Sequence, residues 1–273
     1  MTFAAFIISF ADDELERRAA RFVVHNEQLD EWLAHTSIPI NIIAMNYREG
    51  DRRVDPRITY HDIGPRKTSE ARYEAFRIFY ESDVEWGIIM DNDATLYRSL
   101  QHNSAYGLIA EMSRNLGAYR SLGLFFPLNP AKSPFTKLLA DQMHQDNHVF
   151  TRNMDLKGSM VFVRNFRAAA EAEVWPDVSY DWCEDGKLAM DAVMLGHSVM
   201  RSENIVLRES GLKSSSFGTS TVDRKPFMRA ANARMVHEFG FPLCLSNRFP
   251  HLLDRRSWLT LVWNGARQLI VPK

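Results

Sequence analysis

Two carboxylates stand two positions apart in Asp91-Asn92-Asp93, directly after the apolar run 86–90 (WGIIM). The run predicts a buried strand, and side chains at positions i and i+2 of an extended chain point the same way. Carboxylates aimed at one point repel each other unless a cation lies between them. Mg²⁺ and Mn²⁺ take such oxygen ligands and keep positions open for substrate phosphates. The pattern predicts a metal–diphosphate site; the alternative is a polar turn with ordinary turn formers.

The elements predicted around this pair alternate between strand and helix. We expect strands at 3–10, 38–45, 57–61, 86–90, 121–127, 158–163 and 197–208, and helices at 12–35, 68–82, 99–118, 135–145, 166–173 and 186–195. The polar segments 47–67 and 210–222 are expected to be mostly loop. This order predicts an α/β fold with a mostly parallel central sheet, whose ligands bind at the carboxyl ends of the strands.

Composition and missing motifs narrow the class of protein. The 273 residues are 45% hydrophobic and 25% charged, as in an ordinary folded domain. The two cysteines, Cys183 and Cys244, form no metal or redox motif. The chain has no P-loop, no G-x-G-x-x-G, no G-x-S-x-G and no H-E-x-x-H motif. It also has no signal peptide and no membrane-spanning run, so we expect a cytoplasmic protein without an obligate protein partner.

The order strand, helix, strand, basic loop, Ala-Arg helix and D-x-D strand resembles the GT-A glycosyltransferases. The resemblance implies a Rossmann-like nucleotide-diphospho-sugar transferase fold in a single domain. It also implies that Asp91 and Asp93 hold Mn²⁺ or Mg²⁺ against the diphosphate of a nucleotide sugar, expected to be UDP-linked. The segment 67–76 (KTSEARYEAF) matches the family's Ala-Arg-Asn helix start, with Tyr73 in place of Asn. Lys67 and Arg72 are therefore expected to contact a phosphate or uracil oxygen; the alternative is a solvated helix start.

A second carboxylate pair lies in the segment 181–185 (DWCED), before a predicted helix. The resemblance implies that this segment, with Trp182, lies under the acceptor, and that Asp185 or Glu184 is the base, with Asp185 preferred. Alternatively, the two acids only oppose the helix dipole. Asp191, further along the helix, is interpreted as structural.

The resemblance also implies a third metal ligand near the C-terminus. His237 is the candidate, with His251 and His197 as competitors; an ordinary surface or core histidine is the alternative for each. Lys213, in the loop 210–222, is expected to contact the diphosphate if that loop closes over it. The alternative is that the loop is only a connection.

Charge is distributed unevenly along the chain. Residues 201–273 hold 12 Lys and Arg against 5 Asp and Glu, a balance of +7, whereas residues 1–200 hold 21 against 29, a balance of −8. Aromatic side chains interleave with the C-terminal basic residues, a composition suited to gripping phosphates and stacking on bases. The predicted DNA contacts are Arg224, Lys225, Arg255 and Arg256. A solvated basic face over an aromatic core is the alternative.

The acceptor is suggested by a narrower resemblance. The segment 72–83 (RYEAFRIFYESD), running into 90–94 (MDNDA), resembles phage enzymes that glycosylate hydroxymethylated pyrimidines in DNA. This implies action on 5-hydroxymethylcytosine, in the cytoplasm of the host if the chain is phage-encoded. Within the single domain we expect a nucleotide-sugar-binding half at 1–127, an acceptor half at 128–222 and a basic C-terminal segment at 223–273. Other acceptors, a surface glycan or a protein, stay open. A nucleotidyltransferase or phosphohydrolase using the same aspartates also stays open, as does a non-catalytic binding module.

Overall fold

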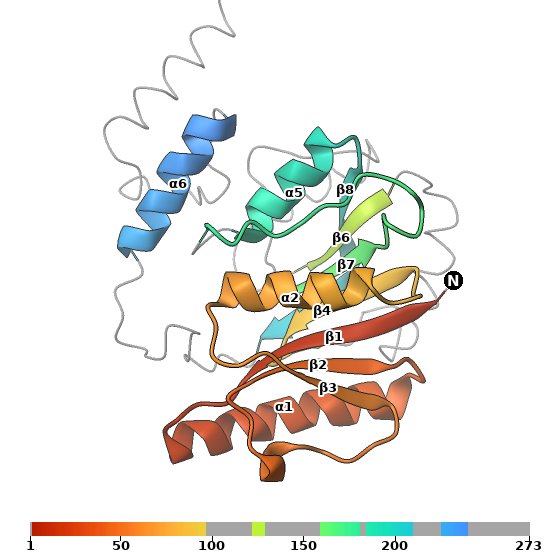
Figure 1. Cartoon of the computed structure of the whole chain (residues 1–273), viewed down its shortest axis with the longest axis vertical. Helices are drawn as coiled ribbons and strands as arrows, with labels where there is room; N and C mark the ends of the chain where they lie inside the picture. The colour runs from red at the N-terminus through yellow and green to blue at the C-terminus, as the bar shows by residue number, and fades with distance from the viewer. Residues whose placement is uncertain (1, 97–121, 129–158, 181–183, 210–224, 240–273) are drawn as a thin grey trace, which may run out of the picture.

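The computed structural model describes residues 2–96, 122–128, 159–180, 184–209 and 225–239, drawn in colour in Figure 1. Its strands are β1 (Phe3–Phe10), β2 (Ile40–Met45), β3 (Ile58–Asp62), β4 (Trp86–Asp91), β5 (Ala94–Leu96), β6 (Leu122–Leu128), β7 (Met160–Arg164) and β8 (Ser198–Glu209). Its helices are α1 (Leu15–His35), the short 3₁₀ turn η1 (Glu49–Asp51), α2 (Thr68–Tyr80), α5 (Glu184–Met194) and α6 (Lys225–Phe239).

The strands of the described residues form one mixed sheet in the order β3-β2-β1-β4-β7-β6-β8-β5. The pairs β3–β2, β2–β1, β1–β4 and β6–β8 are parallel, and β7 runs antiparallel between β4 and β6. The predicted α/β fold class with a mostly parallel central sheet is confirmed. Because β1, β2 and β4 are parallel neighbours, their carboxyl ends share one edge, where Asp91 ends β4.

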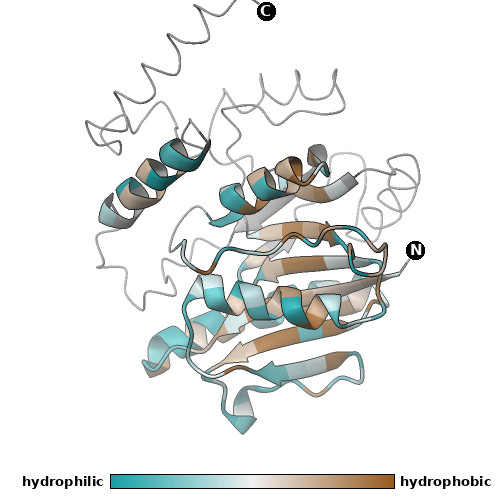
Figure 2. Cartoon of the chain, turned by 45° about the horizontal axis from the view of Figure 1, so that its top comes forward, coloured by the Kyte–Doolittle hydropathy of each residue, from teal (hydrophilic) through white to brown (hydrophobic). Residues whose placement is uncertain are grey.

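Helices cover both faces of the sheet, which explains why the strands are continuously apolar rather than alternating. On one face α2 packs on Phe6, Ile8 and Ile89 of β1 and β4, and α5 packs on β6 and β8. On the other face Leu29 and Trp32 of α1 pack on the alternate residues of the same strands. Figure 2 shows hydrophobic residues gathered in the strands, with polar residues along the helices.

Helix α2 lies very close to the sheet at Gly87 of β4. A Cβ atom added there would come within 2.7 Å of the Phe79 ring, closer than real Cβ contacts allow. Phe79 is fully buried and meets Phe6 edge-on, with ring centroids 5.5 Å apart. Glycine at 87 therefore lets the helix that carries Arg72 sit directly against the strand that carries Asp91.

One local prediction is wrong. The stretch 166–173, expected to be a helix, forms turns instead. The carbonyl of Asn165 accepts the backbone N–H of Ala169, as in one helical turn, and the chain then leaves helical geometry at Ala170, whose φ is +55°. Helix α6, a segment for which the sequence predicts no element, forms over Lys225–Phe239 with Ala231 and Met235 buried one turn apart. The predicted helices at 99–118 and 135–145 lie outside the described residues. No helix in the described ranges is long and apolar enough to cross a membrane.

Candidate functional site

The turn Asp91-Asn92-Asp93 is fixed from below by helix α1. Gln28, fully buried, donates its amide Nε2 to the carbonyl of Asp91 at 2.9 Å and to the carbonyl of Ala94. The backbone N–H of Asp91 donates to the carbonyl of Ser159 at 2.9 Å. Both sides of the turn are thus bonded to neighbouring elements, so the two carboxylates are carried on a fixed backbone.

Asn92 points away from its two acidic neighbours. Its amide donates to Ser9 Oγ at 2.9 Å, and Ser9 is hydrogen-bonded in turn to the Tyr47 hydroxyl. Asn92 is buried, whereas Asp91 and Asp93 are half-buried and reach solvent. The middle residue therefore anchors the turn, and the carboxylates two positions apart remain at the surface of the sheet edge.

Arg72 of α2 joins the two predicted carboxylate pairs. Its guanidinium lies 3.2 Å from Asp91 Oδ1 and 3.1 Å from Glu184 Oε1, and its side chain is 4% exposed. Burial alone would lower the pKa of Arg72, but Glu184, Asp91 and Asp185 outweigh it and raise that pKa. Arg72 is a buried, permanently charged bridge between the two carboxylates. The alternative that it belongs to a solvated helix start is therefore wrong.

Glu184 begins helix α5 and is the most strongly perturbed acid of the described site. Burial raises the pKa of Glu184 to about 7; the charge of Arg72 opposes the shift, and Asp185 and Asp91 add to it. Its neighbour Asp185 accepts the backbone N–H of Gly186 at 3.0 Å. A carboxyl that titrates near neutral pH is suited to taking a proton from a substrate.

A second buried arginine, Arg21 of α1, lies near the aspartate turn. Burial lowers the pKa of Arg21, and the charges of Asp12, Asp93 and Asp91 oppose that shift. Asp12 is 6% exposed, and its Oδ2 has no hydrogen-bond partner among the described residues. In this part of the chain two arginines thus face five carboxylates, Asp12, Asp91, Asp93, Glu184 and Asp185, which leaves an excess of negative charge.

Sequence reasoning missed Arg21, Asp12 and Gln28. One signal was present, because Asp12 follows the end of an apolar strand as Asp91 does. The other two lie on the buried face of a helix with no motif around them.

The residues of the turn fit a hard divalent cation. Asp91 and Asp93 offer carboxylate oxygens at the solvent-facing edge, the ligand type that Mg²⁺ and Mn²⁺ prefer. The negative excess and the unpartnered oxygen of Asp12 favour a positive ion nearby. Within the described ranges no group of three or more His, Cys, Asp or Glu is placed to hold a metal. The assignment of His237, which is exposed on α6, as third ligand stays a prediction.

The remaining predicted contacts fall in different places. The backbone N–H of Lys67, before the first turn of α2, donates to Glu70 at 3.1 Å. Asp191 forms an ion pair with Lys187 one turn earlier in α5, at 2.5 Å, as expected of a structural residue. Lys225 begins α6. Five predicted contacts lie outside the described residues: Trp182, Lys213, Arg224, Arg255 and Arg256.

Comparison with known proteins gives matches only among solved structures. No protein-family description and no curated protein matches the sequence. A protein named as a nucleotide-diphospho-sugar transferase, from Desulfovibrio desulfuricans G20, is 8% identical with a TM-score of 0.41, covering 74% of this chain and 80% of its own.

Two further matches are also named for sugar transfer. Galactosyltransferase LgtC, in complex with donor and acceptor sugar analogues, is 13% identical with a TM-score of 0.42, over 73% of each chain. A glycosyltransferase involved in glycosylating the major capsid protein of PBCV-1 is 8% identical with a TM-score of 0.34, over 62% of this chain and 63% of its own. Similarity at this level does not assign the chain a family or a substrate.

Proposed function

We propose that the chain is a metal-dependent glycosyltransferase that moves a sugar from a nucleotide-diphospho-sugar to an acceptor hydroxyl. The observation that carries this proposal is the Arg72 bridge. One buried guanidinium contacts both Asp91, in a turn suited to a metal, and Glu184, a carboxyl suited to act as a base. A site for a leaving diphosphate and a site for proton transfer are thereby joined on adjacent elements.

The donor end of the proposed site is the edge at the end of β4. Asp91 and Asp93 would hold Mn²⁺ or Mg²⁺, which when bound neutralises the diphosphate as it leaves. Arg72 holds the Asp91 carboxylate in place and adds a fixed positive charge beside it. Lys67, before the first turn of the same helix, is the proposed further contact for the nucleotide, and a UDP-sugar is the expected donor.

The acceptor end is the start of α5. Glu184 accepts the proton of the acceptor hydroxyl while that oxygen forms the new bond to the sugar. The bond between the sugar and the diphosphate oxygen breaks, and its electron pair leaves with the nucleotide. Glu184, which lies 3.1 Å from Arg72 and whose pKa burial raises, is the proposed base, in place of the preference for Asp185 drawn from the sequence. Asp185 is the less suited because it bonds the first turn of its own helix.

The proposed acceptor is drawn from the sequence. Hydroxymethylcytosine in DNA is proposed from the sequence, and its predicted phosphate contacts belong to the basic segment 223–273. A surface glycan or a protein would fit the same two carboxylate pairs. The halves 1–127 and 128–222 are proposed to bind nucleotide sugar and acceptor respectively.

Turnover of defined donors tests the proposal. The chain is incubated with UDP-, GDP- and CDP-sugars, Mn²⁺ and an acceptor panel of hydroxymethylcytosine DNA, unmodified DNA, oligosaccharides and peptides, and the products are weighed by mass spectrometry. We expect a gain of one sugar mass on one acceptor, lost with chelator and in Asp91→Asn and Asp93→Asn. Hydrolysis or nucleotidyl transfer without any sugar gain would contradict the proposal and favour a phosphohydrolase or nucleotidyltransferase.

A further inference from the structure

A strap of seven residues, 174–180, runs along helix α2 before the chain reaches Glu184. At one end the Tyr80 hydroxyl donates to the carbonyl of Val174 at 2.9 Å. Trp175 packs against Tyr80 and Tyr73, with ring centroids 5.0 and 4.9 Å apart. At the other end Ser69 Oγ donates to the carbonyl of Val178 at 3.3 Å. The strap therefore follows α2 from its last turn back to its first.

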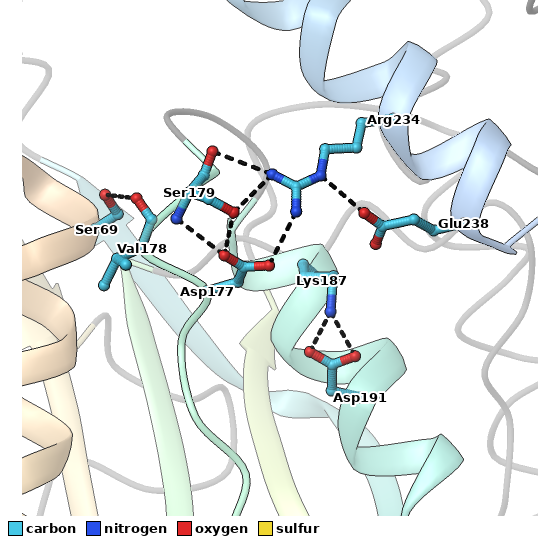
Figure 3. A network of polar contacts seen from close by, with 8 residues as sticks. All are labelled: Ser69, Asp177, Val178, Ser179, Lys187, Asp191, Arg234 and Glu238. Carbon is cyan, nitrogen blue, oxygen red and sulfur yellow. Dashed lines mark hydrogen bonds and ion pairs between the residues drawn. The ribbon is translucent and has the colours of Figure 1, made fainter.

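The far end of the strap is clamped from α6 by Arg234 (Figure 3). Its guanidinium donates to Ser179 Oγ at 2.6 Å and to the Ser179 carbonyl at 3.3 Å, and it lies 3.4 Å from Asp177 Oδ2. The same group lies 4.2 Å from the centre of the Tyr180 ring. Three residues of the strap thus meet one side chain from a distant part of the sequence.

The clamp has a charged partner and an internal anchor. Burial alone would raise the pKa of Asp177, but hydrogen bonds from Ser179 and the charge of Arg234 lower it. The remaining guanidinium nitrogen, Nε, donates to Glu238 on α6 at 2.7 Å. Every nitrogen of Arg234 is therefore engaged within the chain, which sets Arg234 apart from a cation offered to a nucleic-acid phosphate.

The clamp lies directly next to the proposed site. Ser69 precedes Arg72 by three residues, so the strap is bonded to the turn of α2 that carries the bridging arginine. Tyr180, 2% exposed, precedes Glu184 by four residues. The strap therefore links α6 to both members of the Arg72–Glu184 pair, whose distance of 3.1 Å depends on where α5 begins.

We infer that Arg234 is a positioning residue for Glu184: by clamping Asp177, Ser179 and Tyr180 it holds the start of α5 against Arg72. This inference rests on the proposed function only for its effect on catalysis. The contact between Arg234 and the strap can be tested without measuring any activity.

Arg77 supplies a matched control. It lies on α2, its side chain is 44% exposed against 40% for Arg234, and it has an i, i+4 partner, Glu81, as Arg234 has Glu238. Both Arg234→Met and Arg77→Met therefore remove an exposed arginine from a helical ion pair. They differ in that Arg234 also bonds the strap.

Hydrogen exchange and kinetics of the full chain test the inference together. In Arg234→Met we expect the strap amides, including those of Ser179 and Tyr180, to exchange at least ~10-fold faster, because opening then breaks fewer bonds. We also expect kcat for sugar transfer to fall with little change in the donor KM, and the acid limb of the pH–rate profile to move. Arg77→Met should leave all three at wild-type values.

The outcomes separate the inference from the proposed function. Unchanged exchange of the strap in Arg234→Met would overturn the clamp. Faster exchange with an unchanged kcat and pH profile would overturn the positioning role. If the wild-type chain transfers no sugar to any acceptor, the proposed function fails, and the exchange measurement alone still decides the clamp.

Discussion

At the scale of single residues, the site depends on one guanidinium. Arg72 is buried between Asp91 and Glu184, so its charge offsets two carboxylates that would otherwise repel each other. Replacing a buried charge with such partners destabilises the fold, because each carboxylate left behind then has no opposite charge beside it. Stability and the protonation of Glu184 are both tied to this contact.

Replacing Arg72 tests its contribution to the stability of the fold. Arg72→Met is expected to lower the free energy of unfolding by about 3–5 kcal/mol, because it leaves buried acidic charge unpaired. Arg52→Met, which removes the exposed pair with Asp62, should cost about 0–1 kcal/mol. Urea denaturation measures both, and equal losses in the two variants would contradict the bridge.

The pH dependence of the rate tests Glu184. A base must be ionised to accept a proton, and burial raises the pKa of Glu184 to about 7. The rate of sugar transfer is therefore expected to rise with pH through about 7 and to level off above it. Glu184→Gln should lower kcat by roughly 10²–10⁴-fold and remove this acid limb.

Asp185→Asn is the matched control for Glu184→Gln. It should keep the acid limb but move it to lower pH, because the charge of Asp185 then no longer raises the pKa of Glu184. Loss of the limb in Asp185→Asn, with the limb retained in Glu184→Gln, would restore Asp185 as the base.

The residues that sequence reasoning identified are those with a local signal. Asp91 and Asp93 follow an apolar strand, and Glu184 and Asp185 precede a helix, so their positions at element ends were predictable. Arg72 was expected to contact substrate, and its role as a bridge was not foreseen. Arg21 and Gln28 interact with residues about 60 to 70 positions further along the chain. Such long-range contacts produce no periodic pattern in the sequence.

At the scale of elements, the turn after β4 is held by what packs around it. Gln28 bonds both the Asp91 and the Ala94 carbonyls from α1, on the opposite face of the sheet from α2. The carboxylates thus depend on helices that cover both faces. Strand and helix positions in this half were predictable, because apolar runs and helical spacing mark them.

Because α2 packs closely on β4, we expect a single methyl group added at position 87 to destabilise the fold. Gly87→Ala is expected to lower the free energy of unfolding by about 1–3 kcal/mol, because its Cβ would meet the buried Phe79 ring. Gly50→Ala, where an added Cβ would meet nothing within 4 Å beyond its chain neighbours, should be neutral or stabilising by about 0.4–1 kcal/mol. Thermal unfolding distinguishes them, and equal stabilities would contradict the close approach.

The turns at 166–171 and helix α6 show where the sequence predicts a wrong element or none. For Lys225–Phe239 the sequence, which mixes basic and aromatic residues, predicts no element, yet the spacing of buried Ala231 and Met235 suits a helix. The Ala-rich stretch suggested a helix, yet Asn165 caps one turn by accepting the N–H of Ala168 at 3.0 Å, and the chain then turns at Ala170. At 165–170 local hydrogen bonds overrode the helix propensity of alanine.

At the scale of the whole molecule, the near-zero net charge conceals an acidic part and a basic part. The 201–273 segment carries a balance of +7 and the rest of the chain −8. In the described part the acidic excess gathers around Arg21 and Arg72, consistent with a cation site. One residue of the basic part, Arg234, is committed to the strap rather than to a partner.

Salt dependence tests whether the remaining basic residues bind DNA. If DNA is the acceptor, the logarithm of the binding constant should fall linearly with the logarithm of salt concentration, with a slope of about −0.9 per phosphate contact. Charge reversal at Arg255 and Arg256 should weaken binding and make that slope shallower by about 2. Unchanged affinity and slope would exclude these residues as DNA contacts and favour a glycan or protein acceptor.

The central claim is that Asp91 and Asp93 hold a divalent metal at which a nucleoside diphosphate binds. Isothermal titration of Mn²⁺ into the chain, with and without UDP, tests it most directly. We expect UDP to tighten Mn²⁺ binding in the wild-type chain, and Asp91→Asn and Asp93→Asn each to weaken it at least ~10-fold. Mn²⁺ binding that is insensitive to UDP and unchanged in both variants would contradict the account.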